Sequence, residues 1–177
     1  MPKYIMPEKE TVSIKPVYRL IKNNETLDLF KFTDIDEFTQ GYIEALFFTE
    51  NSYLNAEEFE ELQKAEKEIP EGSIPNDVSW LDFDQDTMET IIIECKAFQE
   101  QNYKEIENLY SNNLEQAGHD FWLSRNGHGA GFWDRYLDYK ENRDWYKEIG
   151  DALHAKCGWR TDFPEVNVYF QDGKIYI

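Results

Sequence analysis

Proton-transfer groups, carboxylates and cations are concentrated in one glycine-rich block of the sequence, residues 118–135, which reads GHDFWLSRNGHGAGFWDR. Gly127, Gly129 and Gly131 alternate through the second half of this block. Because glycine tolerates positive φ angles and close backbone approach, these residues predict a shaped turn. The polar side chains of the block are of the types that catalytic and binding sites use: His119, Asp120, Arg125, Asn126, His128, Asp134 and Arg135.

Three interpretations of these residues remain open. A hydrolytic metal site would use His119, Asp120, His128 and Asp134, but their spacing matches no metal motif, so we expect no metal and no cofactor. An acid–base site would use His128 as general base and Arg125 as anion holder, supported by His119 and Asp120. In the third interpretation the glycines set a turn, the His and Asp side chains cap backbone groups, and the charged residues pair with each other or with a partner.

The apolar residues of the block predict a β-hairpin. Phe121 and Leu123 lie two residues apart, as on one face of a strand, and Trp122 would point the other way. Asn126-Gly127 is a strong turn signal. We therefore expect a hairpin with its tip at residues 126–131, continued by Phe132 and Trp133.

The elements that must position this block are mostly helical. Apolar residues at helical spacing predict helices over residues 34–46, 56–67, 84–110 and 143–156, with Trp145, Ile149, Ala152 and Leu153 inward on the last. The Pro- and Gly-containing stretch 68–77 reads as a loop. Residues 166–177 alternate around Asp172-Gly173 and predict a second hairpin.

Helices followed by strands indicate an α+β fold in a single domain over residues 1–177. About four helices would pack on antiparallel hairpins, with the long helix across the sheet. Residues 1–33, with Val12, Ile14 and Pro16, would form an arm or an edge strand. Residues 34–116 would form an acidic helical part, and residues 117–177 a hairpin–helix–hairpin part.

The net charge of −18 is confined to the middle of the chain, because residues 34–116 hold 22 acidic and four basic residues. Such a surface repels nucleic acid and anionic membranes and attracts basic proteins. On the predicted long helix, Glu89, Glu100 and Glu107 lie within about 20° of one another, away from the apolar stripe. One helical turn rises ~5.4 Å, close to the phosphate spacing of a nucleic-acid strand, so these carboxylates could imitate a phosphate backbone.

The remaining composition indicates an intracellular setting. Cys95 and Cys157 match no ligand spacing and read as buried thiols in a reducing compartment. The sequence contains no apolar run near the ~20 residues that cross a membrane, and its N-terminus lacks the apolar stretch of a signal peptide. We therefore expect a cytoplasmic location.

Residues 117–135 resemble the signature AGHDFWLTRNGHGAGFWDR of small, uncharacterised proteins encoded by tailed bacteriophages and related mobile elements, with Ser124 where the relatives often carry threonine. Residues 38–49, FTQGYIEALFFT, are similar to the helix of that family, and residues 172–177, DGKIYI, to its closing strand. The resemblance covers residues 38–177 and departs over 57–86 and 136–163. It implies a phage gene product that acts in the cytoplasm of an infected bacterium.

These observations together predict a non-enzymatic phage accessory protein that binds a host protein with a basic surface. The target would be a defence or nucleic-acid-handling system, inhibited through the acidic face. The binding residues would be Glu89, Glu100, Glu107, Arg125, Asn126, His128, Asp134 and Arg135. We expect no direct nucleic-acid binding by the acidic half and no membrane contact. The alternative is an enzyme that acts on nucleic acid or nucleotides through the glycine-rich block.

Overall fold

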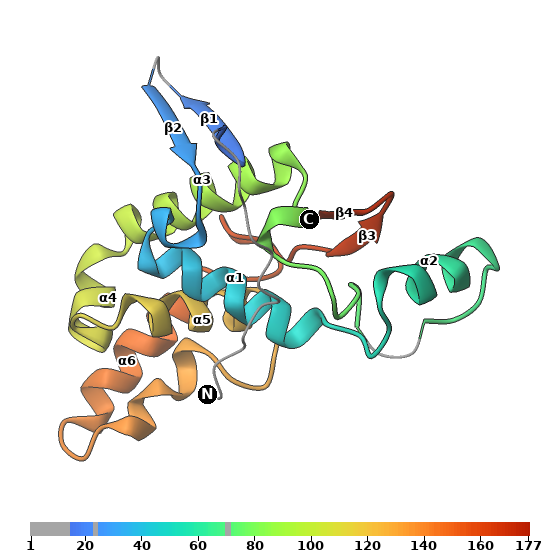
Figure 1. Ribbon diagram of the computed structural model, residues 1–177. Coiled ribbons are helices and arrows are strands. Elements are labelled where there is room, and N and C mark those ends of the chain that lie inside the picture. Colours follow the sequence, from blue (N-terminus) through green and yellow to red (C-terminus); the bar gives the residue numbers. More distant parts are fainter. Residues whose placement is uncertain (1–14, 23–24, 70–71) are drawn as a thin grey trace. The chain divides into compact units, whose positions relative to one another are not determined.

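The computed structural model of the protein describes residues 15–22, 25–69 and 72–177 (Figure 1). These residues form six α-helices, three short 3₁₀-helices and two antiparallel two-stranded sheets, which confirms the α+β class but exceeds the four helices expected. The chain divides into two compact units. Unit 1 comprises Met1–Ile35, Leu46–Ile91 and Asn167–Ile177, and unit 2 comprises Asp36–Ala45 and Ile92–Val166.

Unit 1 contains both sheets. Strands β1 (Tyr18–Lys22) and β2 (Glu25–Leu29) pair antiparallel, and strands β3 (Tyr169–Gln171) and β4 (Lys174–Tyr176) form the C-terminal hairpin (Figure 1). The C-terminal prediction is confirmed, and its turn follows the expected chemistry because Asp172 and Gly173 both have positive φ, 50° and 75°. In the N-terminal segment the structure shows a hairpin; Val12 and Ile14 lie outside the described residues.

The helical elements of unit 1 are the end of α1 (Glu37–Glu50), α2 (Ala56–Lys64), the 3₁₀-helix η2 (Trp80–Asp82) and the start of α3 (Gln85–Gln101). A second 3₁₀-helix, η1 (Phe32–Asp34), precedes α1. Helix α2 confirms the prediction for residues 56–67, and Asn55 caps it by accepting a hydrogen bond from the Glu58 amide at 3.0 Å. Aromatic pairs such as Phe59 with Phe170, 5.8 Å apart, fill the core of this unit.

Unit 2 contains the first turns of α1, the end of α3, and α4 (Tyr103–Tyr110), α5 (Leu114–Arg125), η3 (Phe132–Asp138) and α6 (Arg143–His154). Its core is built around Phe98, whose ring stacks on those of Phe121 at 4.0 Å and Phe132 at 5.5 Å. Phe163 meets the same ring edge-on at 5.0 Å. Aromatic packing therefore joins α3, α5, η3 and the chain after α6.

The predicted single helix over residues 84–110 is two helices, α3 and α4, separated at Asn102. Asn102 is fully buried and has non-helical ψ, 23°. Its amide nitrogen donates to the Phe98 carbonyl at 2.8 Å, and its oxygen accepts a hydrogen bond from Lys156. An asparagine side chain that bonds to nearby backbone competes with the helical ladder, which explains the break. The angular alignment of Glu107 with Glu100, computed for an unbroken helix, therefore does not hold.

The predicted hairpin at residues 121–135 is also wrong, because residues 114–125 form helix α5. Asn113 caps this helix by accepting a hydrogen bond from the Gln116 amide at 3.2 Å. Every residue of α5 from Ala117 to Arg125 is buried. A helix buried on all sides shows no 3.6-residue alternation of apolar and polar residues. The sequence of α5 therefore contains no periodic signal that would identify it as a helix.

Helix α5 crosses α1 at a backbone-to-backbone contact made by two glycines. A Cβ atom on Gly118 would lie 1.8 Å from the Phe38 carbonyl oxygen, and one on Gly41 would lie 2.0 Å from the Glu115 carbonyl oxygen. Only residues without a side chain fit here, on either helix. Two glycines, one on each helix, thus fix where α1 and α5 meet.

Helix α6 confirms the prediction for residues 143–156, but its inward face differs from the one expected. Leu153 is buried, whereas Trp145 is 46% exposed and Ala152 is exposed. Gly150 provides the close approach, because a Cβ there would lie 2.3 Å from the Phe132 carbonyl oxygen. The helix therefore turns its glycine, rather than its tryptophan, toward η3.

No helix among the described residues combines the length and the apolar character needed to cross a membrane.

The glycine crossing predicts a large difference between two Gly→Ala substitutions. Gly118→Ala must push backbone apart and should lower the free energy of unfolding by about 3 kcal/mol or more. Gly129→Ala is the matched control, because an added Cβ there meets no atom within 4 Å; it should change stability by less than about 1 kcal/mol. Urea unfolding followed by circular dichroism measures both. Equal stability of the two variants would mean that the helices do not cross in this way.

Candidate functional site

The polar residues of the glycine-rich block lie in unit 2, and three of them, His119, Asp120 and Arg125, are carried inward by α5. All three are buried, with 7%, 0% and 2% of their surface exposed. Successive residues of a helix are ~100° apart around its axis, so neighbouring side chains leave in different directions. His119 and Asp120 meet different partners, and Arg125, further along the helix, has a third set.

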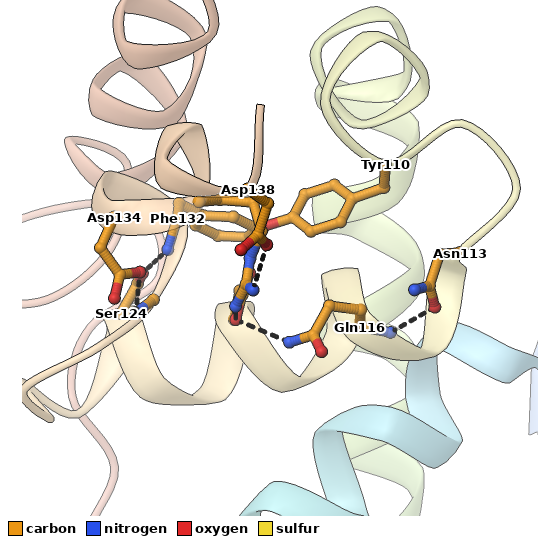
Figure 2. Close-up of polar contacts among 10 residues, drawn as sticks. Tyr110, Asn113, Gln116, Ser124, Phe132, Asp134 and Asp138 are labelled. Carbon is orange, nitrogen blue, oxygen red and sulfur yellow. Dashed lines mark hydrogen bonds and ion pairs between the residues drawn. The ribbon is translucent and has the colours of Figure 1, made fainter. Parts of the chain in front are cut away.

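The Asp120 carboxylate is surrounded by hydrogen-bond donors. The Arg135 guanidinium binds it twice, through Nε and Nη2, each at 2.7 Å. The Tyr110 hydroxyl donates to it at 2.5 Å and the Gln116 amide at 3.0 Å. In Figure 2, Tyr110 reaches inward from α4 toward Asp138, and Gln116 lies on α5. A buried carboxylate with a bidentate arginine and two further donors is fully paired.

The ionisation of the groups around Asp120 follows from this pairing. Burial, followed by the negative charge of Asp120, raises the pKa of the Tyr110 hydroxyl well above its usual value, so Tyr110 remains a donor. Burial alone would lower the pKa of Arg135, but the hydrogen bonds and charge of Asp120 outweigh it and raise that pKa. The cluster therefore holds its protons, which suits a structural ion pair rather than proton transfer.

Arg125 is held by a second set of partners. Its Nη1 donates to Glu94 Oε2 at 2.6 Å and to the Tyr42 hydroxyl at 3.1 Å, and its Nε donates to the Pro164 carbonyl at 2.5 Å. Burial lowers the pKa of Arg125, but the effects of Tyr42 and Glu94 exceed it and raise the pKa overall. With 1% of its side chain exposed, Arg125 cannot hold an external anion in this arrangement.

The glycine-rich stretch 126–131 is the connection between α5 and η3. Asn126 donates to the Trp122 carbonyl at 3.0 Å and accepts from the Val166 amide at 3.0 Å. Asp134 accepts from the Gly131 amide at 3.1 Å, which caps η3. Gly127 has a φ of 68°, as expected directly after a helix end. These geometric roles explain Asn126, Asp134 and Gly127 without a phosphate ligand.

The four residues considered as a metal set do not come together. Asp120 faces Arg135, and Asp134 caps η3. The half-buried His128 donates its backbone amide to the Leu123 carbonyl at 3.0 Å, and its ring lies 6.4 Å from that of Trp122. His119 instead lies beside Glu44 of α1, with Nε2 3.4 Å from Oε2.

A different group of potential ligands forms around His119. One ligand atom each from Glu44, Glu115 and His119 can be chosen so that all lie within 4.8 Å of one another. Glu44 and His119 are buried and Glu115 is half-buried. Glu115 and His119 are four residues apart, on one face of α5, and Glu44 comes from the facing helix α1.

The three glutamates expected on one helical face are distributed over two units. Glu89 is half-buried and belongs to unit 1, whereas Glu100 and Glu107 are exposed in unit 2. The side chain of Glu100 is 68% exposed and lies 3.9 Å from Lys96, and Glu107 accepts a hydrogen bond from Tyr103 at 3.4 Å. Glu100 and Glu107 therefore remain available as exposed negative charges on α3 and α4.

No protein-family model, curated protein or solved structure matches this chain.

Several site residues were not predicted from the sequence. Tyr42, Glu44, Glu94 and Tyr110 come from distant elements, and Glu115 and Gln116 come from the first turn of α5. Their partners on α5 were identified, but as part of a hairpin. Recognition of α5 as a helix would have paired Glu115 with His119 and Gln116 with Asp120 by their i,i+4 spacing.

The ion pair between Asp120 and Arg135 predicts that loss of the buried carboxylate destabilises the protein far more than loss of an exposed one. Asp120→Asn would replace one carboxylate oxygen by an NH2 group, which would face the donor groups of Arg135 and Tyr110. The change should lower the free energy of unfolding by about 3–5 kcal/mol, as when one partner of a buried ion pair is removed. Asp138→Asn removes another carboxylate that binds Arg135, but one that is 62% exposed; its cost should be below about 1 kcal/mol. Urea unfolding at neutral pH compares the two. A cost for Asp138→Asn as large as that for Asp120→Asn would contradict the assignment.

The two thiols of unit 2 predict both low reactivity and alkaline instability. Burial raises the pKa of Cys157 to about 12 and that of Cys95 well above its usual range. The pKa of an unfolded thiol is ~8.5, so the stability gained from these neutral thiols is complete below that pH and is lost as the pH rises toward 12.

Ellman's reagent should therefore label neither cysteine of the native protein at about pH 8, and both after unfolding in urea. A Cys95→Ala/Cys157→Ala variant should lose stability less steeply above about pH 9 than the unchanged protein. Rapid labelling of either thiol in the native state would show that it is not buried.

Proposed function

We propose that this protein is a non-enzymatic bacteriophage accessory protein that binds a host protein through exposed carboxylates. One observation carries the proposal: the charged groups of the glycine-rich block, Asp120, Arg125 and Arg135, are paired internally in unit 2. Their pairing removes the cation that the enzymatic alternative requires for anion binding, because Arg125 is already engaged with Glu94.

The exposed charge of unit 2 supports a basic partner. Glu100 and Glu107 lie exposed on α3 and α4, and the whole chain has a net charge of −18. Charge of one sign attracts a surface of the other sign and speeds association, with a strong dependence on salt. A protein that itself binds nucleic acid offers such a basic surface. A defence or nucleic-acid-handling protein of the host fits this chemistry.

The bacteriophage setting of the proposal comes from the signature at residues 117–135. Mimicry of a phosphate backbone is the finer form of the proposal. Because Asn102 separates α3 from α4, the mimicry would rely on exposed carboxylates from two helices instead of a row along one helix. Glu89 is half-buried and would contribute less than Glu100 and Glu107.

The proposal predicts salt-sensitive binding that depends on one pair of glutamates. Host-lysate proteins retained by the immobilised chain would be identified, purified and titrated against it at several salt concentrations. Glu100→Lys/Glu107→Lys should weaken binding at least about tenfold and flatten its salt dependence, because like charges would face the partner.

Glu57→Lys/Glu61→Lys provides the matched control, because it makes the same charge change at exposed positions of α2 in unit 1. This control should bind nearly as tightly as the unchanged protein. Equal weakening by both variants would indicate attraction by net charge alone. Salt-independent binding that survives the Glu100/Glu107 reversal would refute the acidic surface as the binding site.

A further inference from the structure

We propose that Glu44, Glu115 and His119 form a binding site for a divalent transition-metal ion in unit 2. This inference is independent of the proposed protein-binding function. Their candidate ligand atoms lie within 4.8 Å of one another. Four ligands of a tetrahedral ion at ~2.1 Å lie about 3.4 Å apart, so the most widely separated of these ligand atoms must approach each other by up to about 1.4 Å to bind one ion. Rotation about their side-chain bonds suffices for a movement of that size.

The backbone brings these side chains together at a fixed place. Gly41 of α1 faces the carbonyl oxygen of Glu115, so the two helices touch at the base of the cluster. Glu44 lies three residues after Gly41, and His119 lies four residues after Glu115, so all three side chains leave the backbone within about one turn of the crossing. The crossing therefore positions ligands from two helices before any ion arrives, which lowers the entropic cost of binding.

His119 also lacks the close pairing that Asp120 and Arg125 have on the same helix. The Glu44 and His119 side chains are each only 8% exposed. Their contact, 3.4 Å between Nε2 and Oε2, is long for a hydrogen bond. The other ring nitrogen of His119, Nδ1, is buried and has no hydrogen-bond partner among the described residues. A buried imidazole with no short hydrogen bond is costly unless something else binds it.

Charge gives a second reason for a cation at this place. Glu44 and Glu115 are both carboxylates, and like charges a few ångströms apart repel each other strongly in a buried setting. The ion-pair partner of Glu44 is His119, and a single imidazole carries at most one positive charge, which cannot offset two carboxylates. A divalent ion would neutralise both carboxylates and bind the imidazole nitrogen at the same time.

The donor set selects the class of ion. Imidazole favours zinc, copper, iron and nickel, whereas Ca²⁺ and Mg²⁺ prefer sites made of oxygen alone. Two carboxylates and one imidazole therefore fit a first-row transition ion such as Zn²⁺, with water in the fourth position. Co²⁺ occupies similar sites and has visible absorption, so it serves as the probe.

The test titrates the full chain with Co²⁺ after treatment with a chelator. We expect one ion per chain, visible bands of a protein-bound ion, and their displacement by Zn²⁺ but not by Mg²⁺. Zn²⁺ should also raise the melting temperature, because an ion that binds only the folded state stabilises it. His119→Gln should weaken Co²⁺ binding at least 100-fold, and Glu115→Gln at least tenfold.

His154→Gln is the matched control, since it removes another histidine of unit 2 that lies outside the cluster. Its affinity for Co²⁺ should equal that of the unchanged protein. Circular dichroism establishes that each variant folds, and if His119→Gln does not, the half-buried Glu115 decides the matter through Glu115→Gln. Absence of one-to-one Co²⁺ binding, or binding that persists unchanged in the folded cluster variants, would overturn the proposal.

Discussion

The contact between the backbones of α1 and α5 is the constraint on which the rest of unit 2 depends. At Gly41 and Gly118 neither helix has room for a side chain, so the helices approach closely enough for carbonyl oxygens of one to face Cα atoms of the other. Such an approach buries α5 from Ala117 to Arg125. It also determines which residues of α1, among them Tyr42 and Glu44, meet the polar side chains of α5.

Burial of α5 creates a second requirement, because the helix carries charged residues into the interior. A buried charge is tolerated when its hydrogen-bonding capacity is filled. Asp120 meets this condition through Arg135, Tyr110 and Gln116, and Arg125 meets it through Glu94, Tyr42 and a carbonyl group. His119 differs, because its contact with Glu44 is long and its Nδ1 is unpaired among the described residues. The same helix thus holds two fully paired charged residues, Asp120 and Arg125, and one histidine, His119, without a short side-chain hydrogen bond.

The sequence predicted best those elements that are buried on one side and exposed on the other. Helices α2 and α6 have one buried side, so their apolar residues recur with helical spacing, and the Asp172-Gly173 turn is a local preference of two residues. Helix α5 has no exposed side over Ala117 to Arg125, and the two-residue spacing of Phe121 and Leu123 matched the alternation expected of a strand. The break at Asn102 depends on Lys156, 54 residues away, which no local pattern reveals.

The sequence identified the polar side chains of the glycine-rich block as candidates, but it could not predict their partners. Glu94 and Tyr42 reach Arg125 from elements that only the tertiary structure brings near. Such pairs depend on which faces of two helices come into contact in the folded protein. Sequence patterns show only how apolar and polar residues alternate within one helix. For that reason no sequence pattern identified Glu44 of α1 as a neighbour of His119.

A helix without a solvent side also has little freedom to diverge during evolution. Most surface positions accept substitution because water replaces one side chain as readily as another, but each position from Ala117 to Arg125 touches other parts of the protein. A change at one of them would need a compensating change in a second element. A long run of invariant residues among relatives of this chain would therefore record interlocking packing, and it would do so even if the segment performed no chemistry.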